Sequence, residues 1–305
     1  MNYEQAFYPR QFVFIRGITS VPDHHRMITT SNLTKYFGAL GAVQSISFSV
    51  GKGEVFGLLG PNGAGKTTTI RMLTTLLAPS SGSASVGGYD VIADPLGVKR
   101  SIGVVPQMLN LDIDLTCAEN LEYHGRLQKM KREDRTSRIE ELLHFVGLRE
   151  KKDMPVEHLS GGMRRRLLIA RGLMHRPAVV FMDEPTVGLD PQARRMIWGL
   201  VESLKRSGIT ILITTHYIEE ADALCDRVAI MRTGKIIALD RPVELKKSVG
   251  QFAVECLGRY DVPRQFFPAR AEAIEAGRDL CTDVVVRDVT LEDVFISLTG
   301  ERIEG

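Results

Sequence analysis

The stretch of sequence that decides the fold is Gly60-Pro61-Asn62-Gly63-Ala64-Gly65-Lys66-Thr67. It matches the pattern GxxxxGK[ST] and lies between an apolar run at Val55–Leu59 and a helical pattern at Thr68–Leu77. Such a glycine-rich turn lets backbone N–H groups curl round a phosphate, and the N-terminus of the following helix adds its positive end. A strand-to-helix turn that binds nothing is the alternative, and the completeness of the pattern weighs against it.

Within this loop, residue types predict individual contacts. Lys66 is expected to reach the β- and γ-oxygens of a nucleotide, and the Thr67 hydroxyl to ligate Mg²⁺. Thr68, the next residue, is assigned to the same set of nucleotide contacts. The loop therefore predicts a site for a magnesium nucleotide.

Outward from the loop, short apolar runs bounded by turn residues alternate with helical patterns from about residue 28 to 240. This alternation predicts an α/β fold with a mostly parallel, buried sheet and helices on its faces. The runs expected to form strands are Val55–Leu59, Ile102–Val105, Val179–Met182, Ile209–Thr214 and Val228–Met231.

Between Gln107 and Leu159 the strand signal stops and helical patterns replace it. Thr116 precedes Glu119 by three positions, the signature of a capping box at a helix start. Four apolar residues then recur at i, i+3, i+4 and i+7, the spacing of one buried helix face, namely Ile139, Leu142, Leu143 and Val146. A helical subdomain of about residues 107–175 is predicted, inserted into the α/β core.

Past Pro242 the pattern weakens before it resumes. An apolar strand is expected at Asp283–Val286, followed by a last helix opened by Thr290 and Asp293. A small C-terminal α+β domain, about residues 241–305, is the simplest interpretation.

The other end of the chain carries weaker signals. Residues 1–27 lack the apolar core and cleavage site of a secretory signal, so they are expected to form a poorly ordered extension. Met27 opens the first well-patterned segment and is an alternative start of translation.

Composition narrows the class of protein. Lys and Arg total 39 against 37 for Asp and Glu, so no net field recruits nucleic acid, and no nucleic-acid partner is expected. No apolar run approaches the roughly 20 residues that span a bilayer, so the chain is not expected to cross a membrane itself. The four cysteines form no CxxC pair, which suggests neither a zinc site nor a disulfide framework and favours a reduced, cytosolic setting.

An apolar strand that ends in two carboxylates is the second chemical motif. Val179–Met182 leads directly into Asp183-Glu184, the arrangement of a Walker B element. Asp183 is expected to hold the metal through water, and Glu184 to face the γ-phosphate and polarise the attacking water. A solvated, idle pair of acids is the alternative, and the phosphate loop in the same chain weighs against it.

Leu159-Ser160-Gly161-Gly162 is the third motif and precedes the helical run Met163–Leu173. Ser160 is a good N-cap, and Gly161 and Gly162 leave backbone N–H groups open at a helix N-terminus. The motif therefore predicts a second anion-binding surface in one chain. A capped helix after a loop, with no ligand, explains the same residues when they are taken alone.

In this order and spacing, the three motifs resemble the nucleotide-binding domain of ABC transporters over roughly residues 28–240. The resemblance implies roles for four further residues. Gln107 is similar to the Q-loop glutamine that touches Mg²⁺ and couples to the membrane partner, and His216 to the switch histidine that contacts the γ-phosphate. Asp190 is similar to the D-loop residue at the dimer interface, and Phe37 to the aromatic that stacks on adenine.

The resemblance also implies cofactors, partners and activity. It implies an ATPase that uses ATP and Mg²⁺, with Thr67, Gln107 and Asp183 around the metal. Two copies, or this chain and a similar ATP-binding subunit, would sandwich ATP between the phosphate loop of one and Leu159–Gly162 of the other. The implied fold is a P-loop NTPase core of ABC type with the helical insertion and the C-terminal appendage. One departure is Met163, where the family commonly has glutamine.

Less specific features of the sequence indicate which branch of the family it resembles. The passage Leu109–Leu121, the run Met163–Arg166 and the closing Leu291–Gly300 resemble the drug-resistance and lipo-oligosaccharide export branch. That branch implies a motor at the cytoplasmic face of the membrane, working with a separately encoded permease. Three alternatives stay open: the motor of an importer, a soluble ABC ATPase outside transport, and an ATP-binding regulator without turnover. Glu184 and His216 weigh against the last of these.

Overall fold

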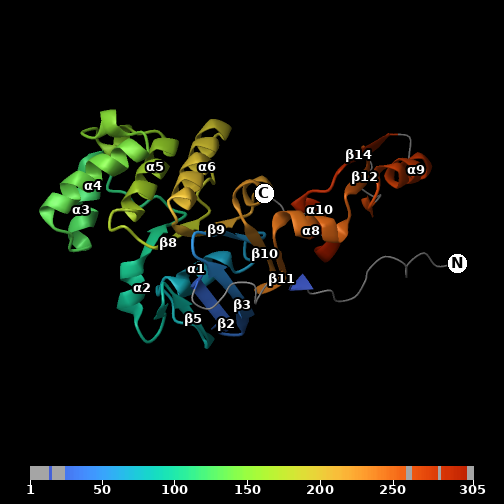
Figure 1. Ribbon diagram of the computed structural model, residues 1–305, viewed down its shortest axis with the longest axis horizontal. Helices are drawn as coiled ribbons and strands as arrows, with labels where there is room; N and C mark the ends of the chain where they lie inside the picture. The colour runs from blue at the N-terminus through green and yellow to red at the C-terminus, as the bar shows by residue number, and fades with distance from the viewer. Residues whose placement is uncertain (1–13, 16–24, 259–262, 281–282, 301–305) are drawn as a thin grey trace.

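Strand β4 (Val55–Leu59), which leads into the phosphate loop, lies at the centre of a seven-stranded sheet of order β1-β11-β10-β4-β9-β8-β7 (Figure 1). The computed structural model describes residues 14–15, 25–258, 263–280 and 283–300, so most of the predicted extension 1–27 lies outside it. The remaining strands of this sheet are β1 (Phe14–Ile15), β7 (Ile102–Val105), β8 (Val179–Asp183), β9 (Thr210–Thr215), β10 (Arg227–Arg232) and β11 (Lys235–Asp240).

Five of these strands form the parallel sheet that the sequence predicts. Neighbours among β10, β4, β9, β8 and β7 pair in parallel, whereas β11 is antiparallel to β10. Every residue of β4, β8 and β9 is buried, as expected for parallel strands covered on both faces. The α/β class is confirmed, and the predicted strand ends differ from the observed ones by one residue at most.

A second, antiparallel sheet was not predicted. It has the order β3-β2-β5-β6 and consists of β2 (Arg26–Phe37), β3 (Leu40–Gly51), β5 (Ser81–Val86) and β6 (Tyr89–Asp90). The pairing of β2 with β3 shifts register several times, and Asn32 and Ser45 have positive φ. These bulges break the period-2 alternation that identifies a strand in sequence. The mostly parallel description of residues 28–240 was therefore incomplete.

The two sheets share a core. The Phe48 ring of β3 stacks on Phe56 of β4 at 5.0 Å between centroids. Arg227 of β10 lies over Phe56 and forms an ion pair with Glu54 at 2.7 Å. The phosphate loop thus starts from a strand that is packed against the antiparallel sheet.

Helices cover the parallel sheet. The helices that contact its strands include α1 (Lys66–Leu73), α2 (Pro95–Ser101), α6 (Pro191–Arg206) and α7 (Ile218–Leu224). Helix α1 ends earlier than predicted because Thr75 has a φ of 61°, which ends the helical conformation. The predicted run Thr68–Leu77 was too long at this end.

The predicted helical insertion is present beside the sheet (Figure 1). It contains α3 (Cys117–Leu127), α4 (Arg132–Phe145), the 3-10 turns η3 (Arg149–Lys151) and η4 (Val156–His158), and α5 (Gly161–Gly172). The capping box of Thr116 and Glu119 is confirmed at the start of α3. The predicted apolar face of α4 is buried, with Leu142 only 2% exposed.

The C-terminal part of the chain forms a small three-stranded sheet, β13-β12-β14, and three helices. Its elements are α8 (Pro242–Val249), β12 (Phe252–Cys256), β13 (Gln265–Phe267), α9 (Arg270–Leu280), β14 (Val284–Asp288) and α10 (Leu291–Thr299). The apolar side of α10 packs against α7 and α8, where Leu291, Val294 and Phe295 join the main core. The capping box of Thr290 and Asp293 is confirmed.

Two further sequence expectations meet the structure here. Cys256 is disulfide-bonded, so the prediction of a chain without disulfides is wrong at this residue, while Cys117 and Cys225 are free and buried. The spacing of cysteines in the sequence does not indicate which of them form disulfides in the folded chain. None of the helices in the described ranges has the length and hydropathy of a bilayer-crossing segment.

A buried carboxylate links α10 to the small sheet. Asp293 is fully buried and accepts hydrogen bonds from Arg287 Nη1 at 2.6 Å, from Arg264 Nη1 at 2.9 Å and from the Thr290 backbone at 2.8 Å. Burial alone would raise the pKa of Asp293, but the bonds from Arg287 and Thr290 outweigh it and hold the pKa below its ordinary value of 3.8.

Asp293→Asn is expected to lower the free energy of unfolding by about 3 kcal/mol, because it removes one partner of a buried ion pair. Glu292→Gln, the half-exposed neighbour, is the matched control and should cost less than about 1 kcal/mol. Urea unfolding followed by circular dichroism measures both.

Since the pKa of Asp293 is lowered, the contribution of its carboxylate to the free energy of unfolding is full above pH 3.8. That contribution disappears only as pH falls through the lower folded-state value. A difference between wild type and Asp293→Asn that already shrinks between pH 8 and pH 6 would contradict this account.

Candidate functional site

The phosphate loop leaves β4 and enters α1 in a conformation that requires glycine at two positions. At Gly60, a Cβ atom would lie 2.3 Å from the Met231 carbonyl oxygen. Gly65, the N-cap of α1, has a φ of 105°, and a Cβ there would lie 2.5 Å from the Ala42 carbonyl oxygen. The loop is therefore fixed against β3 and β10. Between these glycines, Ala64 is buried and Pro61 half-buried, whereas Asn62 and Gly63 are exposed.

Lys66 is the first residue of α1, and its side chain folds back over the loop. Its Nζ donates to the Gly60 carbonyl at 2.7 Å and the Pro61 carbonyl at 3.1 Å. It also lies 3.1 Å from Glu184 Oε1. Lys66 is only 4% exposed, so its ammonium group faces the interior of the site rather than solvent.

The Glu184 carboxylate is the point on which three predicted site residues converge. Besides Lys66, Gln107 Nε2 donates to Glu184 Oε2 at 3.2 Å, and His216 Nδ1 lies 3.2 Å from the same oxygen. Glu184 is 4% and His216 8% exposed. These side chains come from four separate segments of sequence and meet around one carboxylate.

The backbone at Glu184 is unusual. Its φ is 47°, in the left-handed region that residues with a Cβ rarely adopt. Its N–H donates to the Thr214 carbonyl at 3.1 Å and to the Thr214 hydroxyl oxygen at 3.0 Å. The sharp turn directs the carboxylate away from β8 and toward Lys66.

Oxygen ligands for a magnesium ion gather beside this cluster. Thr67 Oγ1 lies 3.1 Å from Asp183 Oδ1, and Thr214 Oγ1 donates to the same carboxylate oxygen at 2.6 Å. A hydroxyl, a carboxylate and the nearby Gln107 amide are the hard oxygen ligands that Mg²⁺ accepts together with phosphate and water. The residues thus fit the metal that the sequence predicts.

Phe37 ends β2 at the turn of the β2–β3 hairpin. Phe37 is 50% exposed, with Lys35 Nζ 5.4 Å from the centroid of its ring. Farther along this hairpin, the Ala42 carbonyl lies so close to Gly65 of the phosphate loop that it leaves no room for a Cβ there. The hairpin therefore presents an exposed aromatic ring on the strand pair that supports the loop.

The third motif and Asp190 lie together, but apart from Glu184. Ser160 caps α5 by accepting from Met163 N at 3.3 Å, as predicted, and Gly161 is exposed with open space where a Cβ would be. Asp190 caps α6 through Ala193 N at 2.8 Å, and Ala193 is also the neighbour of Gly162. Across the described part of the chain, neither group bonds to Lys66, Glu184 or His216.

Sequence reasoning missed several residues that support this site. Thr214 bonds both Asp183 and Glu184, and Arg165 donates to the Gln107 carbonyl at 2.8 Å. Behind them, fully buried Glu220 accepts from Thr186 at 2.8 Å, and burial raises its pKa. No local pattern could have found them, because each acts through packing between distant segments.

Comparisons with known proteins agree with this geometry. Residues 43–187 match the family model described as ABC transporter. Nod factor export ATP-binding protein I of Ralstonia nicotianae is 41% identical, over 99% of each chain. The doxorubicin resistance ATP-binding protein DrrA of Mycobacterium tuberculosis is 47% identical, over 88% of this chain and 91% of its own. The linearmycin resistance ATP-binding protein LnrL of Bacillus subtilis is 43% identical, over 73% and 72%.

Solved structures give the same answer for the fold. An ABC transporter component from Clostridium perfringens superposes with a TM-score of 0.68 at 29% identity, over 72% of this chain and 90% of its own. A dimeric ATP-binding cassette solved with ADP and phosphate gives 0.64 at 27% identity, over 70% and 98%. The phosphate loop, the carboxylates at the end of β8 and these matches lead to one conclusion: the chain belongs to the ATP-binding proteins of ABC transporters and is an ATPase.

Proposed function

We propose that this chain is the ATP-hydrolysing motor of an exporter, working as a dimer at the cytoplasmic face of the membrane with a separately encoded permease. The observation that carries the proposal is the convergence of Lys66, Gln107 and His216 on Glu184. The relatives named for Nod factor export and drug resistance support export of a small or lipid-like molecule over import.

The proposed reaction depends on positioning and charge. Lys66 faces the β- and γ-phosphates, and Glu184 orients and polarises the attacking water. His216, on the other side of the Glu184 carboxylate, contacts the γ-phosphate. Thr67, Asp183 and Gln107 would hold Mg²⁺, which would neutralise charge on the phosphates.

A single chain supplies only part of each proposed site. Gly161 and Ser160 are exposed at the start of α5 and bond to none of the groups around Glu184 in their own chain. We assign them to the ATP of a partner copy, with Asp190 beside them at the interface. Phe37, exposed on the hairpin that supports the phosphate loop, is assigned to the adenine of its own chain.

These roles assign a proposed function to each part of the chain. Residues 28–240 are the proposed ATP-binding domain, with the helical insertion at about 107–175. Residues 241–305 are a proposed packing appendage, since α10 contributes to the main core.

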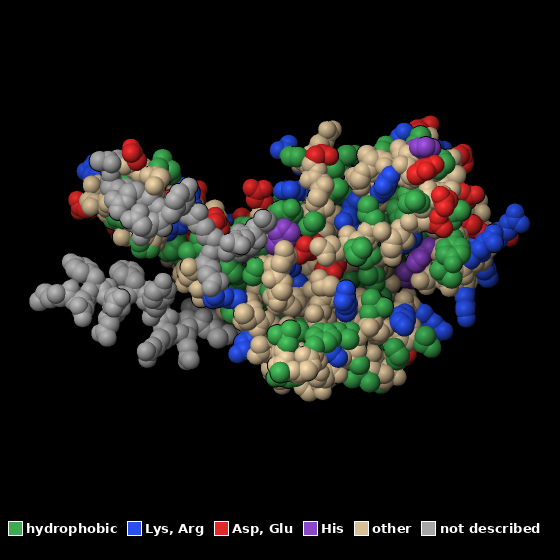
Figure 2. Space-filling model, turned by 180° about the vertical axis from the view of Figure 1, so that it is seen from behind, with side chains coloured by type: hydrophobic (Ala, Val, Ile, Leu, Met, Phe, Trp, Pro, Cys, Tyr) green, Lys and Arg blue, Asp and Glu red, His purple; other side chains and the backbone are tan. Residues whose placement is uncertain are grey.

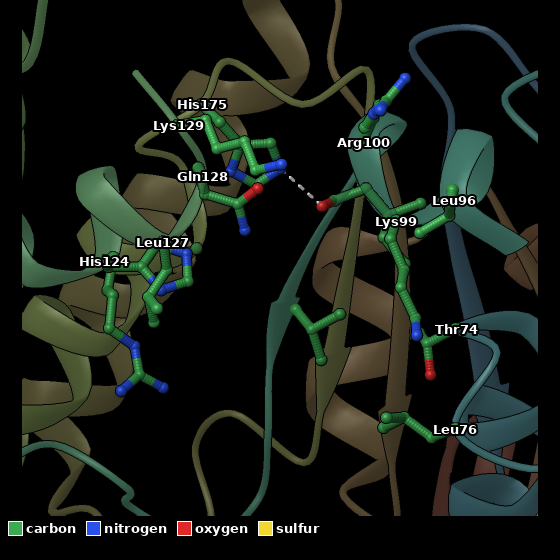
Figure 3. A pocket seen from close by; sticks show the side chains of 14 residues that line it. Thr74, Leu76, Leu96, Lys99, Arg100, His124, Leu127, Gln128, Lys129 and His175 are labelled. Atoms are coloured by element: carbon green, nitrogen blue, oxygen red, sulfur yellow. Dashed lines mark hydrogen bonds between the residues drawn. The ribbon is translucent and has the colours of Figure 1, made fainter. Parts of the chain in front are cut away.

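A cleft between α2 and α3 supports the proposed permease contact (Figure 3). Its volume is about 480 Å³, and exposed Leu76, Leu96 and Leu127 give it an apolar surface. Lys99, Arg100 and Lys129 surround it, and Lys and Arg side chains gather along this edge of the molecule (Figure 2).

At neutral pH the lysine and arginine side chains give the cleft a positive charge, to which His124 does not contribute. Burial, with help from Arg171 and His175, lowers the pKa of His124 to about 4, so that this ring is neutral. His175 Nε2 bonds to the Ile102 carbonyl at 2.8 Å, the dashed line in Figure 3. An apolar cleft with a basic rim suits an amphipathic segment of the permease that carries acidic residues.

Glu184→Gln keeps the shape of the side chain but loses the carboxylate that orients water. This variant should bind ATP and hydrolyse it at least about a hundredfold more slowly. With ATP, it should run as a stable dimer in size-exclusion chromatography, and wild type with ADP is the control. A monomer profile in ATP would contradict the sandwich arrangement.

Gly161→Asp places a carboxylate where a γ-phosphate of the partner's ATP is expected, and like charges repel in a water-poor site. Turnover should collapse while ATP binding at Lys66 survives in a direct titration. Lys66→Ala, by contrast, should lose both turnover and ATP binding. A mixed dimer of the two variants has one site with both lesions and one with neither, so activity should return on mixing. A Gly161→Asp protein with full activity would refute the cross-dimer role.

Reversing two charges at the cleft, in Lys99→Glu with Arg100→Glu, should abolish co-purification with a multi-helix membrane protein in detergent. The ATPase rate of the isolated subunit should stay within about twofold of wild type, because both residues are remote from the phosphate loop. The control is a matched double charge reversal elsewhere, Lys235→Glu on β11 with Lys247→Glu on α8. Retained co-purification in the cleft variant would exclude this surface.

A further inference from the structure

Arg165 is a buried cation that forms no ion pair among the described residues, although the Asp183 carboxylate is near enough to favour its charge. It lies in the second turn of α5 and is 4% exposed. Its Nη1 donates to the Pro106 carbonyl at 2.7 Å and its Nη2 to the Gln107 carbonyl at 2.8 Å. The Arg165 Nε is buried without a hydrogen-bond partner among the described residues. Because unpaired donors of a buried guanidinium are costly, the bonds to these two carbonyls are required rather than incidental.

The same helix holds the loop after β7 at a second point. Arg171 Nη1 donates to the Asn110 carbonyl at 2.7 Å, and Nη2 to the Asn110 side chain. Between the two attachments, Met108 and Leu109 are 81% and 42% exposed. The loop is thus fixed to α5 at both ends, and its middle points outward.

The first attachment coincides with a site residue. While the Gln107 carbonyl accepts from Arg165, the Gln107 amide donates to Glu184 Oε2 at 3.2 Å. Arg165 also lies only five residues from Ser160, a rise of about 7.5 Å along a helix. One rigid helix therefore carries Ser160–Gly162 at its N-terminus and the support of Gln107 within its second turn.

We propose that Arg165 is a positioning residue, whose guanidinium fork fixes the Gln107 backbone to α5 so that the Gln107 amide meets Glu184. Displacement of the α5 N-terminus then moves Gln107 relative to Glu184. The proposal rests on the proposed roles of Gln107 and Glu184 in hydrolysis. It links the surface assigned to the partner's ATP with the site assigned to the chain's own ATP.

The planar fork is essential to this role. Arginine presents two parallel N–H donors in a fixed geometry, whereas lysine offers a single flexible ammonium that satisfies one carbonyl well. Arg164, the preceding residue, provides a matched control. It also donates to two backbone carbonyls, of Val156 at 3.1 Å and Glu157 at 2.7 Å, which lie in η4 rather than in the loop after β7.

The first experiment compares steady-state ATPase kinetics and ATP binding of Arg165→Met, Arg165→Lys and Arg164→Met. Arg165→Met should lower kcat by about tenfold to a hundredfold, because small misplacements of a catalytic group have effects of this size. KM and the Kd for ATP should change less than about twofold, since the phosphate loop is untouched. Arg165→Lys should retain an intermediate kcat, and Arg164→Met should remain within about twofold of wild type.

A double-mutant cycle with Gln107→Ala tests whether Arg165 acts through Gln107. In that background, Arg165→Met should change kcat by less than about twofold, because the group it positions is gone. An equal loss of kcat in both backgrounds, or no loss in wild type, would overturn the proposal. So would a Kd for ATP that rises in parallel with the fall in kcat.

Hydrogen exchange gives a readout that does not depend on turnover. In Arg165→Met, backbone amides of residues 107–110 should exchange about tenfold faster than in wild type, whereas Arg164→Met should leave them unchanged. Unaltered exchange in Arg165→Met would refute the attachment, even if Gln107→Ala is too slow to assay. Failure of the proposed function is seen separately, as normal turnover by Glu184→Gln.

Discussion

The in-register pairing of four parallel strands is the constraint on which the site depends. Leu59 of β4 pairs with Thr215 of β9, Asp183 of β8 with Thr214, and Val105 of β7 with Met182. Their carboxyl ends therefore reach one edge of the sheet at the same level, the usual place for a ligand in an open α/β fold. Lys66, Gln107, Glu184 and His216 each follow one of these strands, and a shift in register would separate them.

Burial of opposite charges adds a second constraint at that edge. Lys66, Glu184 and His216 are each less than 10% exposed, so none can rely on water for solvation. A buried charge is tolerated when it is paired and hydrogen-bonded, and the cluster around Glu184 meets this condition. Groups that are already desolvated and aligned in this way are suited to the proposed hydrolysis, which depends on the stabilisation of charge.

Much of this arrangement could be predicted from the sequence, because it is encoded locally. The strand runs, the phosphate loop, the capping boxes at Thr116 and Thr290 and the N-cap at Ser160 all rest on residues close together in the chain. The antiparallel sheet was missed because its bulges break the alternation of β2 and β3. The contacts of Arg165 and Thr214 were missed because their partners are set only by tertiary packing. The roles assigned to site residues such as Phe37 and Asp190 stay predictions.

The left-handed backbone of Glu184 has an evolutionary consequence. A residue with a Cβ in this region stores strain of about 1 kcal/mol or more, which glycine would avoid. Selection for stability alone would therefore favour glycine at position 184, whereas the proposed role of Glu184 in hydrolysis would oppose that replacement. At this one position, the proposed activity and the stability of the fold therefore make opposite demands on the choice of residue.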